Sequence, residues 1–188
     1  EHIVFLSLQG VEHNRVVPHH KIEKLIEDLG VRYTFLRASF FMQNLSTTQA
    51  AEIRQRSEIA LPVGTAPTSF IDVRDIGAVA VSALTEDHHY NQKYTLTGPE
   101  ALDYFQVASK LSHALERSIR YTHPSAARFI WRQLRAGNKV GYTLVVAALY
   151  TLTRFGNARQ VTRDVETVLG RPPITFDQFA QDYRACWQ

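Results

Sequence analysis

Polar side chains follow two apolar stretches near the amino terminus. Ser7 lies near the end of the first stretch, and Arg37, Ala38 and Ser39 directly follow the second. Ligands of open α/β sheets bind at the carboxyl ends of the strands. Serine hydroxyls and an arginine at such an edge would suit hydrogen bonds to a polar ligand. The spacing therefore predicts a small-molecule site at this edge.

Other chemistry is poorly supported by the residue pattern. The adjacent pairs His19-His20 and His88-His89 could suggest a metal. Neighbouring side chains of a regular strand or helix point in different directions, however, and no helical i, i+4 histidine pair is present. We therefore expect no metal site. Hydrolysis through a nucleophile is also not expected, because there is no G-x-S-x-G motif and Cys186 lies in a terminal helix.

The elements that would position this edge form a strand–helix–strand unit. His2–Leu8 is an almost continuous apolar run and predicts a buried strand. His19–Leu29 has apolar residues at helical spacing and ends at Gly30, and Val31–Leu36 is rich in β-branched and aromatic residues. We expect parallel strands with a right-handed crossover.

The remaining chain alternates between helices and short extended pieces. We expect extended pieces at Ser69–Asp72, Tyr94–Thr97 and Arg120–Thr122. The expected helices are Phe40–Arg56, Ile76–Thr85 with Asp75 as N-cap, Leu102–Leu115, a basic stretch after Pro124, Arg163–Leu169 and Phe176–Cys186. Asp72 and Asp75 are interpreted as structural residues rather than catalytic acids. The fold class is α/β.

Composition sets further bounds. The chain has 188 residues, of which 45% are hydrophobic, and a net charge of +3, which excludes intrinsic disorder. The apolar stretch Val140–Thr153 is shorter than the about 20 residues that a spanning helix needs. A single cysteine fits a reducing compartment, and no secretory leader is visible. We therefore expect a soluble, cytoplasmic protein with no membrane partner.

Positive charge is concentrated in residues 110–163, where Glu116 is the single acid. Such a segment could bind a protein partner, phosphates or nucleic acid, or it could be a solvated helical surface. We favour the solvated surface, since no nucleic-acid-binding motif accompanies the charge, and nucleic acid is an unlikely partner.

Several blocks, in order along nearly the whole chain, resemble the NmrA-like family of atypical short-chain dehydrogenases/reductases. They are His2-Ile-Val-Phe-Leu-Ser7, Lys21 with Ile22–Leu29, Val31-Arg-Tyr-Thr-Phe-Leu-Arg37, Phe41-Met-Gln-Asn44, Phe70-Ile-Asp-Val-Arg-Asp75, Tyr94-Thr-Leu-Thr-Gly98 and Phe176-Asp-Gln-Phe179. The resemblance implies part of a Rossmann-like parallel sheet with flanking helices in residues 1–100. Residues 101–188 would form a small, mainly helical, substrate-side region.

The resemblance also implies roles for individual residues. Lys21 matches the family's lysine and would be a ribose contact or a weak general acid. An NAD or NADP cofactor would contact Ser7, Lys21, Arg37, Ala38 and Ser39, and the substrate pocket would include Phe40, Phe41 and Asn44. An equally acceptable interpretation places Phe40 and Phe41 in the core and Asn44 at a helix cap.

Two departures from the wider superfamily stand out. Its common members place a tyrosine four residues before the lysine, but Val17 occupies that position here. No glycine-rich phosphate-binding turn is present either. We therefore expect the chain to begin at about the fifth strand of the family's sheet. It would be either part of a longer protein or a truncated relative that has lost the turn that binds the cofactor.

Two functions follow from the resemblance. The first is an NAD(P)H-dependent oxidoreductase with a small-molecule substrate. The alternative is a non-catalytic redox sensor or transcriptional regulator, which would contact a protein partner through residues 110–163. The missing tyrosine favours the sensor, whereas the retained Lys21 is compatible with an enzyme.

Overall fold

A computed structural model describes all residues, 1–188. The chain forms two compact units, and each is built from three segments. Unit 1 contains Glu1–Gln43, Ser69–Ala101 and Gln160–Thr175. Unit 2 contains Asn44–Thr68, Leu102–Arg159 and Phe176–Gln188.

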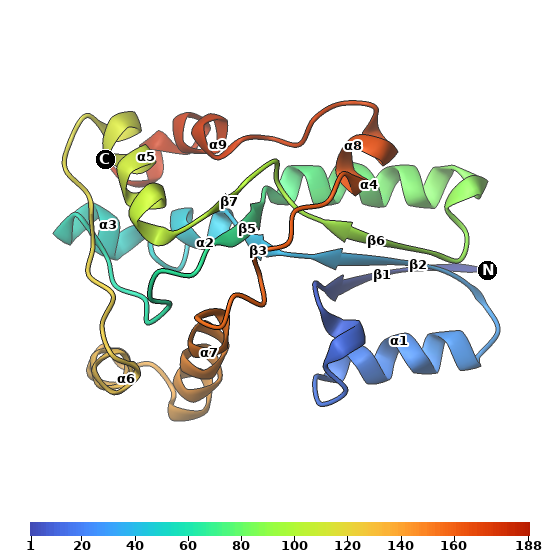
Figure 1. Cartoon of the computed structure of the whole chain (residues 1–188), viewed down its shortest axis with the longest axis horizontal. Helices are drawn as coiled ribbons and strands as arrows, with labels where there is room; N and C mark the ends of the chain where they lie inside the picture. Colours follow the sequence, from blue (N-terminus) through green and yellow to red (C-terminus); the bar gives the residue numbers. More distant parts are fainter. The chain divides into compact units, whose positions relative to one another are not determined.

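A parallel sheet is the centre of unit 1. Its strands are β1 (His2–Leu8), β2 (Arg32–Ala38) and β6 (Gln92–Leu96), in the order β1-β2-β6. Their arrowheads point the same way in Figure 1. Helix α1 (Pro18–Asp28) connects β1 to β2 and begins with a proline, which lacks the N–H that a first turn leaves unpaired. The predicted strand–helix–strand unit is confirmed.

Helices cover both faces of this sheet (Figure 1). Because side chains alternate along a strand, Leu36 and Ala38 of β2 face one way and Phe35 and Arg37 the other. Leu36 and Ala38 pack with α4 (Val73–Thr85) and α8 (Asp164–Leu169). Their core cluster comprises Leu36, Ala38, Ile71, Ile76, Val79, Leu96 and Val165. The opposite face receives α1.

The expected helix Phe40–Arg56 is wrong over its first part. Phe40–Phe41 forms strand β3, which pairs in parallel with β5 (Thr68–Ile71). The pairing is extended by Met42, whose N–H donates to the carbonyl of Ile71 at 2.9 Å. Two short helices follow, α2 (Gln43–Ser46) and α3 (Ala50–Arg56). Aromatic residues favour a strand when a partner strand is available, which outweighs local helical spacing here.

The cap of α4 also differs from the expectation. Asp72, rather than Asp75, is the N-cap, and its side chain accepts from the N–H of Arg74 at 2.9 Å. Asp75 lies inside the first turn and is buried. There it accepts from the N–H of Ile174 at 2.7 Å and pairs with Arg171 at 2.8 Å. Both aspartates are therefore structural, as interpreted, but Asp75 anchors a distant segment.

Unit 2 is mainly helical. It contains α5 (Tyr104–Leu115), α6 (Ala126–Arg135), α7 (Val140–Thr153) and α9 (Phe176–Asp182), with a small parallel pair of β4 (Glu58–Ile59) and β8 (Arg120–Tyr121). Trp187 is fully buried, and its indole N–H donates to the carbonyl of Leu45 at 2.8 Å. The strand β7 (Ala101–Leu102) lies where the chain passes from unit 1 to unit 2.

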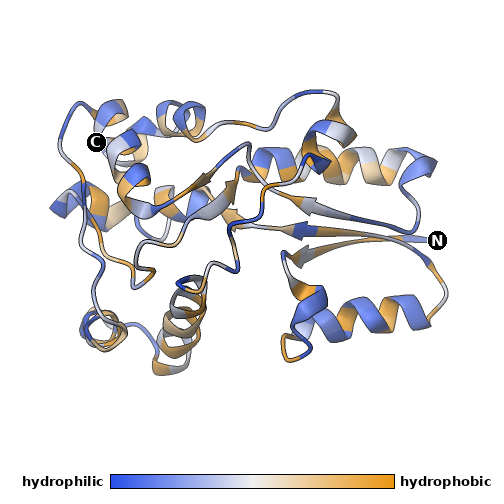
Figure 2. Ribbon diagram, in the orientation of Figure 1, coloured by the Kyte–Doolittle hydropathy of each residue, from blue (hydrophilic) through white to orange (hydrophobic).

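Helix α7 carries the most continuous apolar colour in Figure 2. It has 14 residues, and no helix of the structure combines the length and apolarity needed to cross a membrane. Three short 3₁₀ turns complete the structure, namely η1 (Val11–His13), η2 (Asp87–His89) and η3 (Arg184–Cys186).

Candidate active site at the carboxyl edge of the sheet

Ser7 has a buried hydroxyl without a hydrogen-bond partner. It lies near the carboxyl end of β1, is only 4% exposed, and its Oγ contacts no donor or acceptor. A buried hydroxyl left unpaired costs about 1–3 kcal/mol, so proteins rarely keep one without a reason. The predicted position of Ser7 at the sheet edge is thus accompanied by an unused hydrogen-bonding capacity.

A hydrogen-bonded group of side chains lies at the same edge. The hydroxyl of Ser39, directly after β2, donates to the carbonyl of Ser69, and the two hydroxyls are 2.9 Å apart. The Ser69 hydroxyl donates to Oε1 of Gln9 at 3.3 Å. Gln9 is held in turn by its backbone N–H, which donates to the carbonyl of Ala38 at 2.9 Å. These bonds fix the ends of β1, β2 and β5 relative to one another within unit 1.

A glycine closes this edge from the side of β6. The N–H of Gly98 donates to the carbonyl of Phe70 at 2.6 Å. A Cβ at residue 98 would stand 2.4 Å from the same oxygen, so no side chain fits there. The close backbone approach explains why glycine ends the predicted strand Tyr94–Thr97.

Arg37 shares a sheet face with Ser7, because the two residues are register partners. Its guanidinium is engaged, with Nη2 2.6 Å from Oε2 of Glu23 and Nε 3.1 Å from Oε1. Nη1 also lies 3.2 Å from a carboxylate oxygen of Glu12. Burial by itself lowers the pKa of Arg37, but the two carboxylates outweigh it, and the pKa lies above its ordinary value. Arg37 thus fastens α1 to β2, and its predicted cofactor contact remains a prediction.

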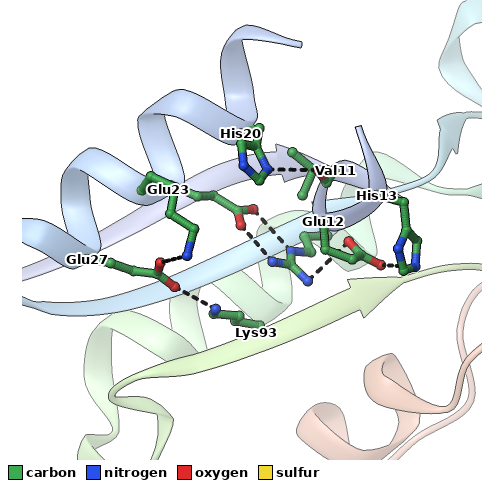
Figure 3. A network of polar contacts seen from close by, with 9 residues as sticks. Val11, Glu12, His13, His20, Glu23, Glu27 and Lys93 are labelled. Carbon is green, nitrogen blue, oxygen red and sulfur yellow. Dashed lines mark hydrogen bonds and ion pairs between the residues drawn. The ribbon is translucent and has the colours of Figure 1, made fainter. Parts of the chain in front are cut away.

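The ion pairs continue along α1, as Figure 3 shows. Glu27 accepts from Lys24 and Lys93, both at 2.6 Å, and these hydrogen bonds lower the pKa of its carboxyl group. A cavity of about 390 Å³ adjoins this network and is lined by charged side chains and His20. Ligand pockets are mostly apolar with a few polar groups, so this cavity is a poor match for a cofactor site.

The other predicted residues are distributed as follows. Lys21 is exposed in the first turn of α1, whose N-cap is Val17. The Ala38 side chain belongs to the core, and Phe41 is half-buried and packs against that core. Phe40 is half-buried on β3. Asn44 belongs to unit 2.

Sequence reasoning missed Gln9 and Ser69. Gln9 carried a usable signal, because it stands between a predicted strand and Gly10, where open α/β sheets place ligand contacts. The sequence around Ser69 contains no such signal, since its position beside Ser39 depends on the pairing of β3 with β5.

Some cations of the basic segment are engaged inside unit 2. Arg132 pairs with Glu52 and with Glu58, the latter at 2.9 Å, and Lys110 pairs with Asp177 at 2.6 Å. Arg117 donates to the carbonyl of Trp187 at 2.8 Å. These contacts give several of the cations an internal role, and a protein partner for residues 110–163 remains a prediction.

Comparison with known proteins decides the family. The model of the NmrA-like family matches residues 7–171. The chain belongs to the NmrA-like family. It is 36% identical over 165 residues to an NAD(P)H azoreductase of Xenophilus azovorans, covering 88% of this chain and 57% of that protein. It is 34% identical over 192 residues to festuclavine dehydrogenase of Aspergillus fumigatus, covering 98% of this chain and 64% of the relative. The NmrA-like chain thus spans little more than half the length of such relatives.

Solved structures confirm the Rossmann-type fold of this NmrA-like chain. An NADPH-dependent quinone oxidoreductase of Escherichia coli superposes with a TM-score of 0.88 at 21% identity, over 96% of this chain and 66% of that structure. Triphenylmethane reductase of Citrobacter, complexed with NADP(H), superposes with a TM-score of 0.85 at 18% identity, over 97% of this chain and 65% of that structure. The negative transcriptional regulator NmrA, in complex with NAD, superposes with a TM-score of 0.71 at 16% identity, over 96% of this chain and 63% of that structure. At these identities the likeness shows the fold alone.

Proposed function

We propose that this NmrA-like chain takes part in the NAD(P)H-dependent reduction of a small organic molecule. The observation that carries the proposal is the buried, unpartnered hydroxyl of Ser7 at the carboxyl edge of a parallel sheet. The azoreductase and dehydrogenase names of relatives at least 30% identical support the reaction class. The reaction is assigned to the cytoplasm, in keeping with the free thiol of Cys186.

The residues at this edge suit the nicotinamide end of NAD(P)H. The Ser7 hydroxyl has an unused donor and two unused acceptor sites, and an amide or ribose hydroxyl would satisfy them. Lys21, in the first turn of α1, would bind a ribose hydroxyl. The chain contains no glycine-rich turn for a pyrophosphate, so its contribution would be confined to the nicotinamide and the substrate. NAD(P)H, when bound, supplies a hydride.

Reduction also requires a proton and a surface for the substrate. Lys21 is the proton donor in this proposal, since Val17 cannot transfer a proton and the lysine ammonium is exposed. The donor atom is Nζ, and the acceptor is the substrate atom that becomes electron-rich on reduction. Phe40, half-buried on β3, would offer its aromatic ring to a planar substrate such as a quinone or an azo compound, whereas the adjacent Phe41 packs against the core.

The test compares two variants of the purified full-length protein with matched controls. Ser7→Ala and Lys21→Ala are assayed by oxidation of NADPH or NADH with quinone and azo acceptors. Ser118→Ala and Lys24→Ala change an exposed serine and an exposed lysine of the same types. We expect Lys21→Ala to lower kcat by about a hundredfold, the usual scale of one acid–base group. Ser7→Ala should chiefly raise the KM for the cofactor.

Two results would contradict the proposal. The first is a full-length protein that oxidises neither cofactor with any of these acceptors. The second is an active protein in which Ser7→Ala and Lys21→Ala behave as the control variants do.

A further inference from the structure

Glu86, His88 and His89 bring three metal-ligating groups together at the turn between α4 and β6. Their ligand atoms all lie within 4.8 Å of one another. We propose that these three side chains bind one divalent transition-metal ion, with Zn²⁺ as the ion that best suits the donor set. Two imidazole nitrogens and one carboxylate oxygen are known as a zinc ligand set, with the fourth position left to water.

His89 provides the independent sign of a ligand. Its side chain is 2% exposed, and its Nε2 is buried without a hydrogen-bond partner. Its Nδ1 lies 2.8 Å from the hydroxyl of Tyr94. When Nδ1–H donates to Tyr94, the lone pair remains on Nε2, which is the form that binds a metal. In this tautomer the buried nitrogen has the free lone pair that coordination requires.

The spacing of the donor atoms also fits an ion. Oε2 of Glu86 is 3.6 Å from Nε2 of His88 and 3.9 Å from Nε2 of His89. Both separations are too long for hydrogen bonds. Ligands at about 2.0–2.1 Å from a tetrahedral zinc are about 3.3 Å from each other, by the geometry of a tetrahedron. Small rotations of the exposed Glu86 and His88 side chains would close the difference.

The local backbone explains how adjacent histidines converge. Regular helices and strands send neighbouring side chains apart, but His88 and His89 lie in the 3₁₀ turn η2. Their ring centroids are 4.0 Å apart, with the planes inclined by 42°. Glu86 is both the C-cap of α4 and the N-cap of η2, and its extended backbone ends the helix there.

The turn is held firmly against the sheet. The Thr34 hydroxyl donates to the carbonyl of His89 at 2.6 Å, and the ring of His2 lies 2.9 Å from the same hydroxyl. The N–H of Asn91 donates to the carbonyl of Tyr33 at 2.6 Å. The proposed site is thus built on a rigid support, which lowers the cost of ordering its ligands.

The site lies at the amino ends of the strands, beside the chain terminus marked N in Figure 1. Ser7 is near the opposite end of β1. An ion at Glu86, His88 and His89 would therefore link the end of α4 to the start of β6 without taking part in reduction. Because the unfolded chain does not hold this arrangement, the ion would stabilise the folded state.

The experiment titrates Zn²⁺ into untagged full-length protein that has been treated with a chelator and desalted. We expect one ion per chain by calorimetry, and a Co²⁺ form with the intense visible bands of four-coordinate geometry. His88→Ala and Glu86→Gln should each raise the Kd by about tenfold or more. Tyr94→Phe should raise it by about tenfold, since it removes the partner that orients His89. His13→Ala, which changes an exposed histidine beside another glutamate, should leave the Kd unchanged.

His88 is exposed, so its loss leaves folding intact, as circular dichroism would verify. The proposal is overturned if the protein binds no ion stoichiometrically. It is also overturned if His88→Ala and Glu86→Gln bind Zn²⁺ as tightly as the unchanged protein does. These outcomes are independent of the reductase assay.

Discussion

Glu23 of α1 receives two hydrogen bonds from the guanidinium of Arg37 on β2, at 2.6 and 3.1 Å. The Glu23 side chain is 6% exposed and that of Arg37 is 11% exposed. The pair joins the helix that carries Lys21 to the strand that ends at the candidate active site. A bidentate pair of this kind sets orientation as well as energy.

Removing one partner of this pair should be costly. Arg37→Met leaves the Glu23 carboxylate buried without its donor, and we expect a loss of about 3 kcal/mol in the free energy of unfolding. The double variant Glu23→Leu/Arg37→Met removes both charges and should recover most of that loss. Urea denaturation of the four proteins in the cycle measures the coupling. Equal stabilities of Arg37→Met and the unchanged protein would show that the pair contributes nothing.

Two glycines should respond to alanine in opposite directions. Gly98→Ala places a Cβ 2.4 Å from the carbonyl oxygen of Phe70, so the backbone must move, and we expect a loss of about 2 kcal/mol or more. Gly77 lies within α4 with nothing near its Cβ position, and Gly77→Ala should stabilise by about 0.5–1 kcal/mol. Thermal unfolding of both variants would check this. A neutral Gly98→Ala would mean that the approach to Phe70 is looser than described.

Asp72 should make stability depend on acid pH. Burial raises the pKa of its carboxyl group, but hydrogen bonds from Arg74 and Gln43 outweigh burial, and the pKa lies below its ordinary value. A lowered folded-state pKa gives stability that is present above the unfolded value, about 3.9, and is lost as the pH falls through the folded value.

Asp72→Ala removes this contribution together with the helix cap. We expect a loss of about 1–2 kcal/mol at neutral pH, and a smaller further loss on acidification than in the unchanged protein. Unfolding free energies measured from pH 6 downward test both parts. Parallel acid profiles for the two proteins would contradict the assignment.

Tyr121 should limit stability at alkaline pH. Its hydroxyl donates to the carbonyl of Leu61 at 2.9 Å, and burial raises its pKa to about 12. A raised folded-state pKa gives stability that is fully present below the unfolded value of about 10 and is lost as the pH rises through about 12. Tyr121→Phe should therefore be less stable at neutral pH but lose less between pH 10 and 12. Chemical denaturation across that range measures the difference.

Local sequence patterns were enough to predict the strand–helix–strand unit and the family of this protein. The apolar run His2–Leu8 and the β-branched and aromatic residues of Val31–Leu36, with a helix that ends at Gly30 between them, were enough to predict parallel strands and the edge where Ser7 and Ser39 lie. The ordered blocks around Lys21 and Phe70–Asp75 were enough to indicate the family. Such features depend on residues close in sequence, so they can be derived without coordinates.

Tertiary contacts decided the rest. Phe40 and Phe41 form a strand because their backbone pairs with β5, which lies about thirty residues later in the chain. The ion pairs of Arg37 with Glu12 and Glu23 form because a turn and a helix, both distant in sequence, place two carboxylates against its guanidinium. The ligand atoms of Glu86, His88 and His89 lie close together in a turn whose His89 carbonyl accepts from Thr34, a residue of β2 that is distant in sequence. In each case the deciding free energy comes from a group distant in sequence, which local propensity does not contain.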